Sequence, residues 1–177
     1  MVWQTPDRNG VLNDFSQEIK AVHKLKSFAI VGTDLLAQCV SKSVGDMGAD
    51  IAYGNGQRFG VPLGYGGPHA AFFASKRKLI RQAPGRIIGI SKDPRGKDGF
   101  RISLSTREQH IKRERATSNI CTAQVLLSNM NFFYCLWHGE DGLVSIAQRV
   151  NYLTQRFCHL LSEHNVQPLN YNPEAKV

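Results

Sequence analysis

The sequence has no cysteines close enough together to suggest a metal site. Its four cysteines are far apart, and none belongs to a CxxC pair or to a cysteine and histidine cluster at zinc-ligand spacing. A structural zinc site or a disulfide framework needs such spacing. We therefore expect no bound metal and mostly buried free thiols at Cys39, Cys121, Cys135 and Cys158.

The sequence also lacks a long apolar run. No stretch approaches the roughly 20 apolar residues that a helix needs to span a bilayer, so we expect no membrane partner. The first thirty residues carry Asp7, Asp14 and Glu18, and they show neither an apolar core segment nor an arginine-rich amphipathic pattern. They therefore contain no visible signal or transit peptide, and this part of the sequence does not indicate a compartment.

Positive charge is the main compositional excess. The 22 lysines and arginines outnumber the 14 acidic residues and give a net charge of +8, and clustered positive charge can bind nucleic acid by releasing counterions from phosphates. The densest basic run, 107–115, is interrupted by Glu108 and Glu114 and has no aromatic side chains for base stacking. We therefore expect a solvated or phosphate-facing helix surface and no nucleic-acid partner, with nucleic-acid binding as a distant alternative.

The order of the apolar segments predicts an α/β domain. A chain of 177 residues is long enough for one core, at roughly 100–200 residues per domain. Strand-like segments at 1–4, 27–31 and 49–53 alternate with helical patterns at about 14–26 and 35–40. This alternation is typical of right-handed βαβ crossovers, and it predicts a mostly parallel sheet with flanking helices. The expected break after the second strand is Gly32-Thr33-Asp34.

The stretch 54–71, GNGQRFGVPLGYGGPHAA, is the most constrained part of the sequence. It holds six glycines and two prolines, which cost about 1 and 3 kcal/mol each relative to alanine in a helix. A tight irregular loop is expected, followed by a buried strand at 70–74. The spacing fits neither GxxxxGK[ST] nor GxGxxG, so the loop is not a standard nucleotide loop. Like Asp34, it follows a predicted strand, and ligands of parallel sheets bind at such strand ends.

The sequence pattern in the second half of the chain predicts a β-hairpin and two long helices. Strand candidates at 86–91 and 100–105 flank a turn at 93–99. Apolar residues at helical spacing then indicate one helix that ends at 138–139 and another over 140–163. The apolar stripes of both helices must pack against another surface.

Two groups of polar residues are candidates for chemistry. Thr117, Ser118 and Asn119 precede the first long helix, where backbone N–H groups and hydroxyls can bind an anion. An ordinary helix cap is the alternative. Asp34 can face a cationic cofactor group or cap the helix that follows it.

The histidines are weaker candidates. None of His69, His110 and His138 has a neighbouring serine, cysteine or aspartate arrangement that reveals a catalytic unit. We expect structural roles for them, and solvated roles for Lys92, Arg95 and Lys97 in and beside the hairpin turn.

Three runs of sequence carry a family resemblance. QRFGVPLGYGGPHAAFFA at 57–74, PGRIIGISKD at 84–93 and TREQHIKRERATSNICTAQ at 106–124 closely resemble the glycine decarboxylase P-protein family, the glycine dehydrogenases of the glycine cleavage system. The resemblance covers about residues 1–166. It implies a pyridoxal-phosphate-dependent enzyme of the fold type I, aminotransferase-like class.

The resemblance also implies an activity and partners. Members decarboxylate glycine and pass the aminomethyl group to the lipoyl arm of H-protein, and the parent is expected to be dimeric, with one catalytic half or subunit. This chain resembles the later part of the N-terminal, non-lysine half. Within it, we expect residues 1–137 to form part of the large domain and residues 138–177 to hold a long helix and the start of the small-domain region. A non-catalytic domain that binds the catalytic half or H-protein is the alternative.

The resemblance places the Schiff-base lysine outside this chain. In the catalytic half that lysine immediately precedes a glycine-rich loop, whereas the corresponding position here is Gln57-Arg58, and no lysine lies between Lys42 and Lys76. Only a primary amine can form the covalent link to the cofactor. We therefore expect no catalytic residue in this chain and no activity of the chain alone. Asp34 corresponds to the acid that faces the pyridine nitrogen in related domains.

The resemblance suggests one contribution to a neighbouring active site. In this fold class a loop at the dimer interface commonly contacts the phosphate of the other subunit's cofactor, and Thr117, Ser118 and Asn119 are the candidates here. Arg107 and His110 are weaker candidates for the same interface. A eukaryotic parent would be mitochondrial and a bacterial one cytoplasmic.

Overall fold

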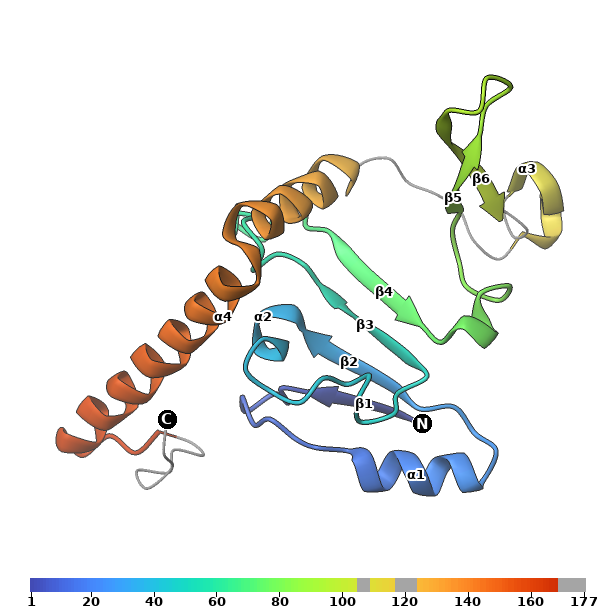
Figure 1. Cartoon of the computed structure of the whole chain (residues 1–177). Helices are drawn as coiled ribbons and strands as arrows, with labels where there is room; N and C mark the ends of the chain where they lie inside the picture. Colours follow the sequence, from blue (N-terminus) through green and yellow to red (C-terminus); the bar gives the residue numbers. More distant parts are fainter. Residues whose placement is uncertain (105–108, 117–123, 169–177) are drawn as a thin grey trace. The chain divides into compact units, whose positions relative to one another are not determined.

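The structure, a computed structural model, describes residues 1–104, 109–116 and 124–168 (Figure 1). The chain divides into two compact units. The first combines Met1–Ala74 with Gln124–Val177, and the second is Ser75–Ala123. The glycine-rich stretch and Asp34 both belong to the first unit.

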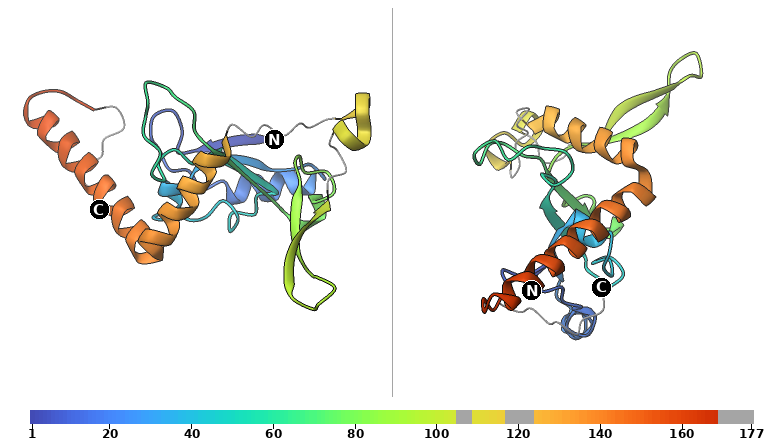
Figure 2. Two further views of the ribbon diagram at one scale, coloured as in Figure 1. Left: turned by 90° about the horizontal axis from the view of Figure 1, so that it is seen from above. Right: turned by 90° about the vertical axis from the view of Figure 1, so that its left-hand side faces the viewer.

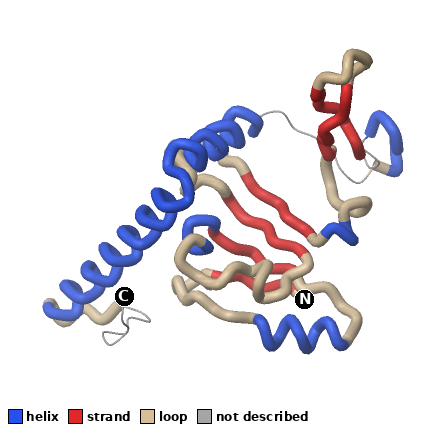
Figure 3. The backbone as a smooth tube through the Cα atoms, in the orientation of Figure 1, coloured by secondary structure: helices blue, strands red, loops and turns tan. Residues whose placement is uncertain are grey.

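A four-stranded sheet forms the centre of the first unit. Its strands, in spatial order, are β1 (Val2–Thr5), β2 (Ile30–Asp34), β3 (Ile51–Asn55) and β4 (Ala71–Ser75), and Figure 3 shows them side by side. The pairs β1–β2 and β2–β3 are parallel. The predicted parallel arrangement with intervening crossovers is therefore present in these three strands.

The fourth strand runs in the opposite direction. The N–H of Gly56, just beyond β3, donates to the carbonyl of Ala70, just before β4, at 2.8 Å. The chain therefore turns back on itself through the glycine-rich stretch before it enters β4. This reversal means that the stretch leaves from the carboxyl end of β3 and stays beside that end of the sheet.

Helix α1 (Ser16–Lys24) connects β1 to β2 and covers the sheet. Its buried Ile19 packs in one cluster with Ala29 and Val31 of the second strand region, both fully buried. Trp3 and Phe15 stack beside this cluster with ring centroids 5.6 Å apart. The apolar spacing that predicted this helix therefore marks the face that packs on the sheet.

A buried polar contact joins α1 to the start of β3. Nε2 of His23 lies 2.7 Å from Oδ2 of Asp50, whose side chain is fully buried. The same oxygen accepts a hydrogen bond from the N–H of Ala29 at 3.0 Å. Asp50 thus links the helix, the chain entering β2 and the chain entering β3, a role that the sequence pattern alone did not reveal.

The long helical segment α4 (Val125–Glu163) contains a sharp break. Gly139 leaves the helical conformation with φ 64° and ψ −174°, and Figure 2 shows the resulting bend. The expected end of the first helix at His138-Gly139 is confirmed. The domain boundary expected between residues 137 and 138 stays a prediction.

The segment α4 packs on the short helix α2 (Leu35–Gln38) and on the glycine-rich stretch. Leu36, Phe59 and Ala147 are buried together, with Tyr134 and Leu143 packed around them. Most of the remaining apolar stripe of α4 is exposed, including Leu126 and Phe157. The described residues therefore cover only a small part of the stripes that the sequence predicted.

The second unit holds the predicted hairpin. Strands β5 (Ile87–Lys92) and β6 (Asp98–Leu104) are antiparallel, with Lys92 opposite Asp98. The short helices η1 (Arg77–Leu79), α3 (Gln109–Lys112) and η2 (Arg113–Arg115) complete its described part.

The hairpin turn is held by Asp93, whose Oδ1 accepts the N–H groups of Arg95 and Lys97, both at 2.8 Å. The ammonium group of Lys92 pairs with Asp98, and both side chains are exposed. The basic residues at the tip are thus solvated, as expected.

Two sequence expectations are wrong in detail. The strand expected at 70–74 is present as β4, but four of its five residues are exposed rather than buried. Gly32-Thr33-Asp34 does not break the strand, because β2 begins at Ile30 and continues to Asp34. Gly32 pairs with Gln4 on one side and with Tyr53 on the other, and a Cβ at Gly32 would lie 3.2 Å from the Tyr53 ring. The glycine therefore reflects the close approach of a neighbouring side chain rather than a turn.

Candidate functional site

Asp34 lies where β2 ends and α2 begins. Its Oδ1 accepts a hydrogen bond from the N–H of Ala37 at 2.8 Å, so the side chain caps the first turn of α2. The cap role that we considered for Asp34 is confirmed. This contact satisfies one of the free N–H groups at the helix start and fixes the carboxylate at the carboxyl end of the sheet.

The same carboxylate forms an ion pair with Arg58. Nη1 of Arg58 lies 2.9 Å from Oδ1 of Asp34. The side chain of Asp34 is 24% exposed and that of Arg58 is 46% exposed. The structure thus joins the residue at the expected cofactor-acid position to a residue at the expected lysine position.

Sequence reasoning singled out both residues but missed their contact. The available signal was their placement, since each follows one of two consecutive strands. When such strands are parallel neighbours, their carboxyl ends lie at the same edge of the sheet. An acid and a base that follow these ends are therefore candidates for an ion pair.

A small hollow lies beside Asp34. Its volume is about 230 Å³. The lining residues come from the ends of the first three strands: Gln4, Thr5, Pro6, Gly32, Thr33, Asp34, Tyr53, Gly54 and Asn55. The hollow is smaller than the roughly 300–1,000 Å³ typical of sites for small molecules and cofactors.

The first part of the glycine-rich stretch is held by α4. Nδ2 of Asn131 donates to the carbonyls of Gly56 and Phe59, both at 2.7 Å. A Cβ at Gly56 would lie 2.3 Å from Oδ1 of Asn131, and one at Gly60 would lie 2.7 Å from the Tyr134 ring. Gly60 also has φ +80°, in the left-handed region that favours glycine. The glycines here allow close packing against a helix.

The second part of the stretch is more exposed. An open hollow of about 540 Å³ is lined by Gln57, Leu63, Gly64, Tyr65, Gly66 and His69. Nδ1 of His69 lies 3.2 Å from the carbonyl of Gly67, which is a local contact within the loop. We find no pair of this histidine with a nucleophile or an acid among the side-chain hydrogen bonds of residues 1–104, 109–116 and 124–168.

The other candidate histidines also lack a catalytic arrangement in the described part of the chain. His138 lies on α4 with its ring centroid 4.4 Å from that of Tyr134. His110 is an exposed residue of α3 in the second unit. Arg107, Thr117, Ser118 and Asn119 lie outside the described residues, so the expected phosphate contact stays a prediction.

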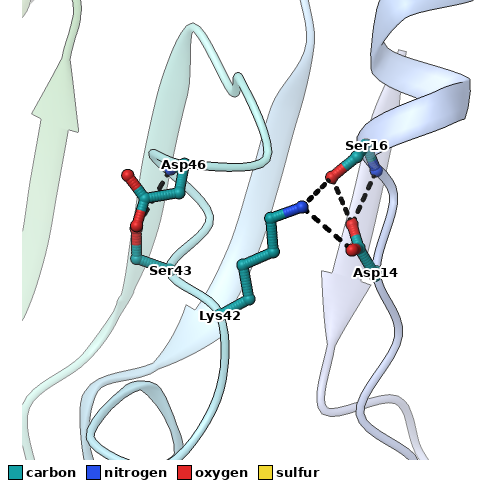
Figure 4. Close-up of polar contacts among 5 residues, drawn as sticks. All are labelled: Asp14, Ser16, Lys42, Ser43 and Asp46. Carbon is teal, nitrogen blue, oxygen red and sulfur yellow. Dashed lines mark hydrogen bonds and ion pairs between the residues drawn. The ribbon is translucent and has the colours of Figure 1, made fainter.

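A second polar cluster lies between the start of α1 and the segment after α2 (Figure 4). Nζ of Lys42 contacts Oδ2 of Asp14 at 3.0 Å and Oγ of Ser16 at 2.6 Å. Asp14 accepts hydrogen bonds from the Ser16 hydroxyl and from the Ser16 N–H. These contacts, with the Ser16 hydroxyl first, lower the pKa of Asp14 from 3.8 to about 2.

The described cysteines are free thiols. Cys39, Cys135 and Cys158 are all partly buried. Burial raises the pKa of the Cys39 thiol, and the negative charge of Asp34 acts in the same direction, so this thiol is a poor nucleophile. Within the described residues no group of three or more metal-ligating side chains comes together, and no helix there combines the length and apolar character needed to cross a membrane.

The first unit defines an α/β protein of the crossover type. It has three parallel strands, a connecting helix on the sheet and polar residues gathered at the carboxyl strand ends. Comparison with protein families then gives a specific assignment: the family model for "Glycine cleavage system P-protein" matches residues 1–173. The chain therefore belongs to the glycine cleavage system P-protein family.

Curated relatives agree with this assignment. The chain is 52% identical over 174 residues to a protein from Cereibacter sphaeroides named "Glycine dehydrogenase (decarboxylating)", covering 98% of this chain and 18% of that protein. It is 52% identical over 154 residues to "Glycine dehydrogenase (decarboxylating), mitochondrial" from Mus musculus, covering 87% of this chain and 15% of the relative. The chain thus spans less than a fifth of the length of these two enzymes.

A solved structure supports the fold. A glycine decarboxylase (P-protein) of the glycine cleavage system, in inhibitor-bound form, superposes with a TM-score of 0.83 at 37% identity. The match covers 92% of this chain and 36% of that one. The expected fold class, a partial P-protein-type α/β domain with a mostly parallel sheet, is confirmed.

The residues around Asp34 do not fit a covalently bound pyridoxal phosphate. The cofactor needs a lysine for its Schiff base and an acid or arginine to face its ring nitrogen. The residues that line the hollow include no lysine, the neighbouring positions hold Gln57 and Arg58, and Asp34 already pairs with Arg58. The acid that the resemblance implies is therefore already paired with Arg58, and no lysine stands at the positions where the resemblance leads one to expect it.

Proposed function

We propose that this chain is part of the lysine-free half of a P-protein that decarboxylates glycine and passes the aminomethyl group to the lipoyl group of H-protein. The observation that carries the proposal is the Arg58–Asp34 pair, which lies where the resemblance locates the cofactor amine and acid. The family assignment supports the activity of the parent. The ion pair favours a structural role for this half, which would assist the catalytic half without holding the cofactor.

Pyridoxal phosphate, which a lysine of the catalytic half would hold, would supply the electron sink for loss of carbon dioxide from glycine. The residues of this chain contribute a stable structure and no chemical step. Asn131 holds the glycine-rich turn through Gly56 and Phe59, and Leu36 packs α2 against the same region. Together they keep a rigid domain against which the catalytic half can assemble.

The proposed partners are the catalytic half, H-protein and glycine, in a dimeric parent. The exposed apolar stripe on the first part of α4 supports an assembled state, because large contiguous apolar patches are rare on monomers. It includes Leu126, Phe133 and Trp137, which is 86% exposed. Thr117, Ser118 and Asn119 are proposed to contact the phosphate of the cofactor bound in the catalytic half, with Arg107 and His110 nearby.

The cellular compartment of the parent protein depends on the kind of organism that makes it. The relative from Mus musculus is named as mitochondrial, and other relatives come from bacteria. We propose a mitochondrial location in a eukaryote and a cytoplasmic one in a bacterium.

Exchange of labelled bicarbonate into glycine tests the proposal. We expect no exchange and no cofactor absorbance from the chain alone, because it has no lysine at the site. We expect exchange when the rest of the lysine-free half, the lysine-bearing half and H-protein are supplied with it. A borohydride-reducible cofactor adduct on the chain alone would contradict the proposal, as would a complete set of partners that binds the chain but stays inactive.

A non-catalytic binding domain is the second candidate. The exposed face of α4 favours it, since a partner could bind there without any chemistry. The two candidates differ in one result. If the catalytic half binds the chain and exchange is observed, the first candidate is supported. If either partner binds the chain but deleting this segment leaves exchange unchanged, the second candidate is supported.

A further inference from the structure

We infer that Arg58 acts as an internal counter-charge that, together with the small hollow beside Asp34, keeps this half free of the cofactor, and that placing a lysine at position 58 would not by itself give cofactor binding. The inference rests on the proposed function, because it assumes that the site descends from one that held pyridoxal phosphate. It goes further by assigning a specific role to the Arg58–Asp34 pair.

Charge is the first argument. A carboxylate at this position serves a pyridine cofactor by facing a protonated ring nitrogen. Here Oδ1 of Asp34 already accepts from the Arg58 guanidinium at 2.9 Å and from the N–H of Ala37 at 2.8 Å. An arginine stays protonated at any physiological pH. A cationic ring would therefore have to displace a permanent cation from a carboxylate that also caps a helix.

Preorganisation is the second argument. Residues on both sides of Arg58 are fixed, because the carbonyls of Gly56 and Phe59 accept from the same Asn131 amide. Phe59 is also buried against Leu36. The backbone that carries the guanidinium is thus held in place, so forming the ion pair costs little backbone entropy.

Space is the third argument. The hollow beside Asp34 has a volume of about 230 Å³, which is below the roughly 300 Å³ at the lower end of cofactor and ligand pockets. The Tyr53 ring lies close over Gly32, and the backbone at Gly54 lies close to Thr33. Removing the charge of Arg58 would leave these close contacts, and therefore the volume of the hollow, unchanged.

These arguments predict the behaviour of Arg58→Lys. The shorter side chain still carries a cation, and the Asp34 carboxylate favours its protonated form. A protonated amine cannot attack an aldehyde, so the variant gains a primary amine without gaining a reactive one.

The test uses the assembled protein that carries this segment, in four variants: Arg58→Lys, Arg58→Met, Asp34→Asn and the double variant R58M/D34N. Pyridoxal phosphate is added, borohydride reduces any adduct, and peptide mapping locates the label. Unfolding temperature is followed for each variant. Arg95→Met serves as a matched control, because it removes an exposed arginine from the hairpin turn.

We expect no label at position 58 in Arg58→Lys beyond the background of the unmodified chain. We expect Arg58→Met and Asp34→Asn each to lower the unfolding temperature, and the double variant to lose less than the sum of the two, since the pair is lost only once. Strong label at position 58 in Arg58→Lys would overturn the inference. Fully additive losses in the double variant would overturn it as well.

The proposed function fails in a different experiment. Absence of glycine–bicarbonate exchange in the unmodified assembly contradicts the proposed function. The labelling and unfolding measurements use no activity, so they decide the role of Arg58 separately.

Discussion

The two parts of the glycine-rich stretch are built in different ways. Residues 54–61 are held by partners far away in the sequence, including Asn131 and Tyr134 of α4. Residues 63–67 form turns with one another: the N–H of Gly66 donates to Leu63 at 3.0 Å, and the N–H of Gly67 donates to Gly64 at 2.9 Å. The same residue type therefore serves close packing in one part and chain reversal in the other.

This difference shows what the glycines do for function. In the first part they allow the turn that carries Arg58 to approach α4 and the sheet, so they fix the Arg58–Asp34 pair. In the second part they allow a left-handed backbone at Gly64 and Gly66 with open space around Gly66. Substitutions that add one methyl group should separate these roles.

Gly54→Ala should have the largest effect. A Cβ at Gly54 would lie 2.0 Å from the carbonyl oxygen of Thr33 and 2.6 Å from the Phe72 ring. Since the first contact is with backbone in the paired strand β2, the sheet itself must shift. We expect a loss of about 3 kcal/mol in the free energy of unfolding, measured by denaturant titration of the folded assembly.

Gly66→Ala is the matched control. Gly66 has φ +83°, and a Cβ there would meet no atom within 4 Å. Only the left-handed backbone penalises alanine, at about 1 kcal/mol. Equal losses for Gly54→Ala and Gly66→Ala would contradict the distinction between the two parts of the stretch.

Asn131→Ala should have the next largest effect. It removes both hydrogen bonds from the amide to the carbonyls of Gly56 and Phe59, at about 2 kcal/mol in total. Asn129→Ala on the same helix is the control, because Asn129 is exposed. Hydrogen exchange at residues 56–61 should rise in the first variant alone. Unchanged exchange there would show that α4 does not hold the turn.

The strand and helix order of the first unit could be predicted from sequence because its signals are local. Apolar runs and helical spacing identified all three parallel strands and α1. The exact limits of β2 could not be predicted, because Gly32 looks like a turn residue until Tyr53 is known to lie beside it. A glycine in a strand has a long-range cause that single-sequence patterns do not carry.

The candidate site divides in the same way. Asp34 could be recognised as a cap, whereas the expectation that Gln57-Arg58 stands where the catalytic half has its lysine comes from the family resemblance and stays a prediction. The Arg58–Asp34 pair was missed, because its only signal was the placement of both residues after consecutive strands, and that signal indicates a contact only when the two strands are neighbours. The Asn131 contacts join residues 75 and 72 positions apart, and nothing in the local sequence around Asn131 indicates them.

The cluster around Asp14 combines a contact with a residue close in the sequence, Ser16, and a contact with a distant one, Lys42. It therefore compares local and long-range contacts at the site where the smallest effect is expected. The Ser16 hydroxyl is the largest cause of the low pKa of Asp14, and Lys42 from after α2 adds to it. We expect Ser16→Ala to raise the pKa of Asp14 more than Lys42→Met does. Carbon-detected NMR titration of the Asp14 carboxyl measures both changes.

The direction of the pH effect follows from the lowered pKa. The pKa of Asp14 falls from 3.8 to about 2 in the folded protein, so the ionised carboxylate favours folding. This contribution is complete above pH 3.8 and is lost as the pH falls through about 2. If Lys42→Met raised the pKa of Asp14 more than Ser16→Ala, the long-range contact would dominate the cluster. The residues next to Asp14 in the sequence would then be a poor guide to its pKa.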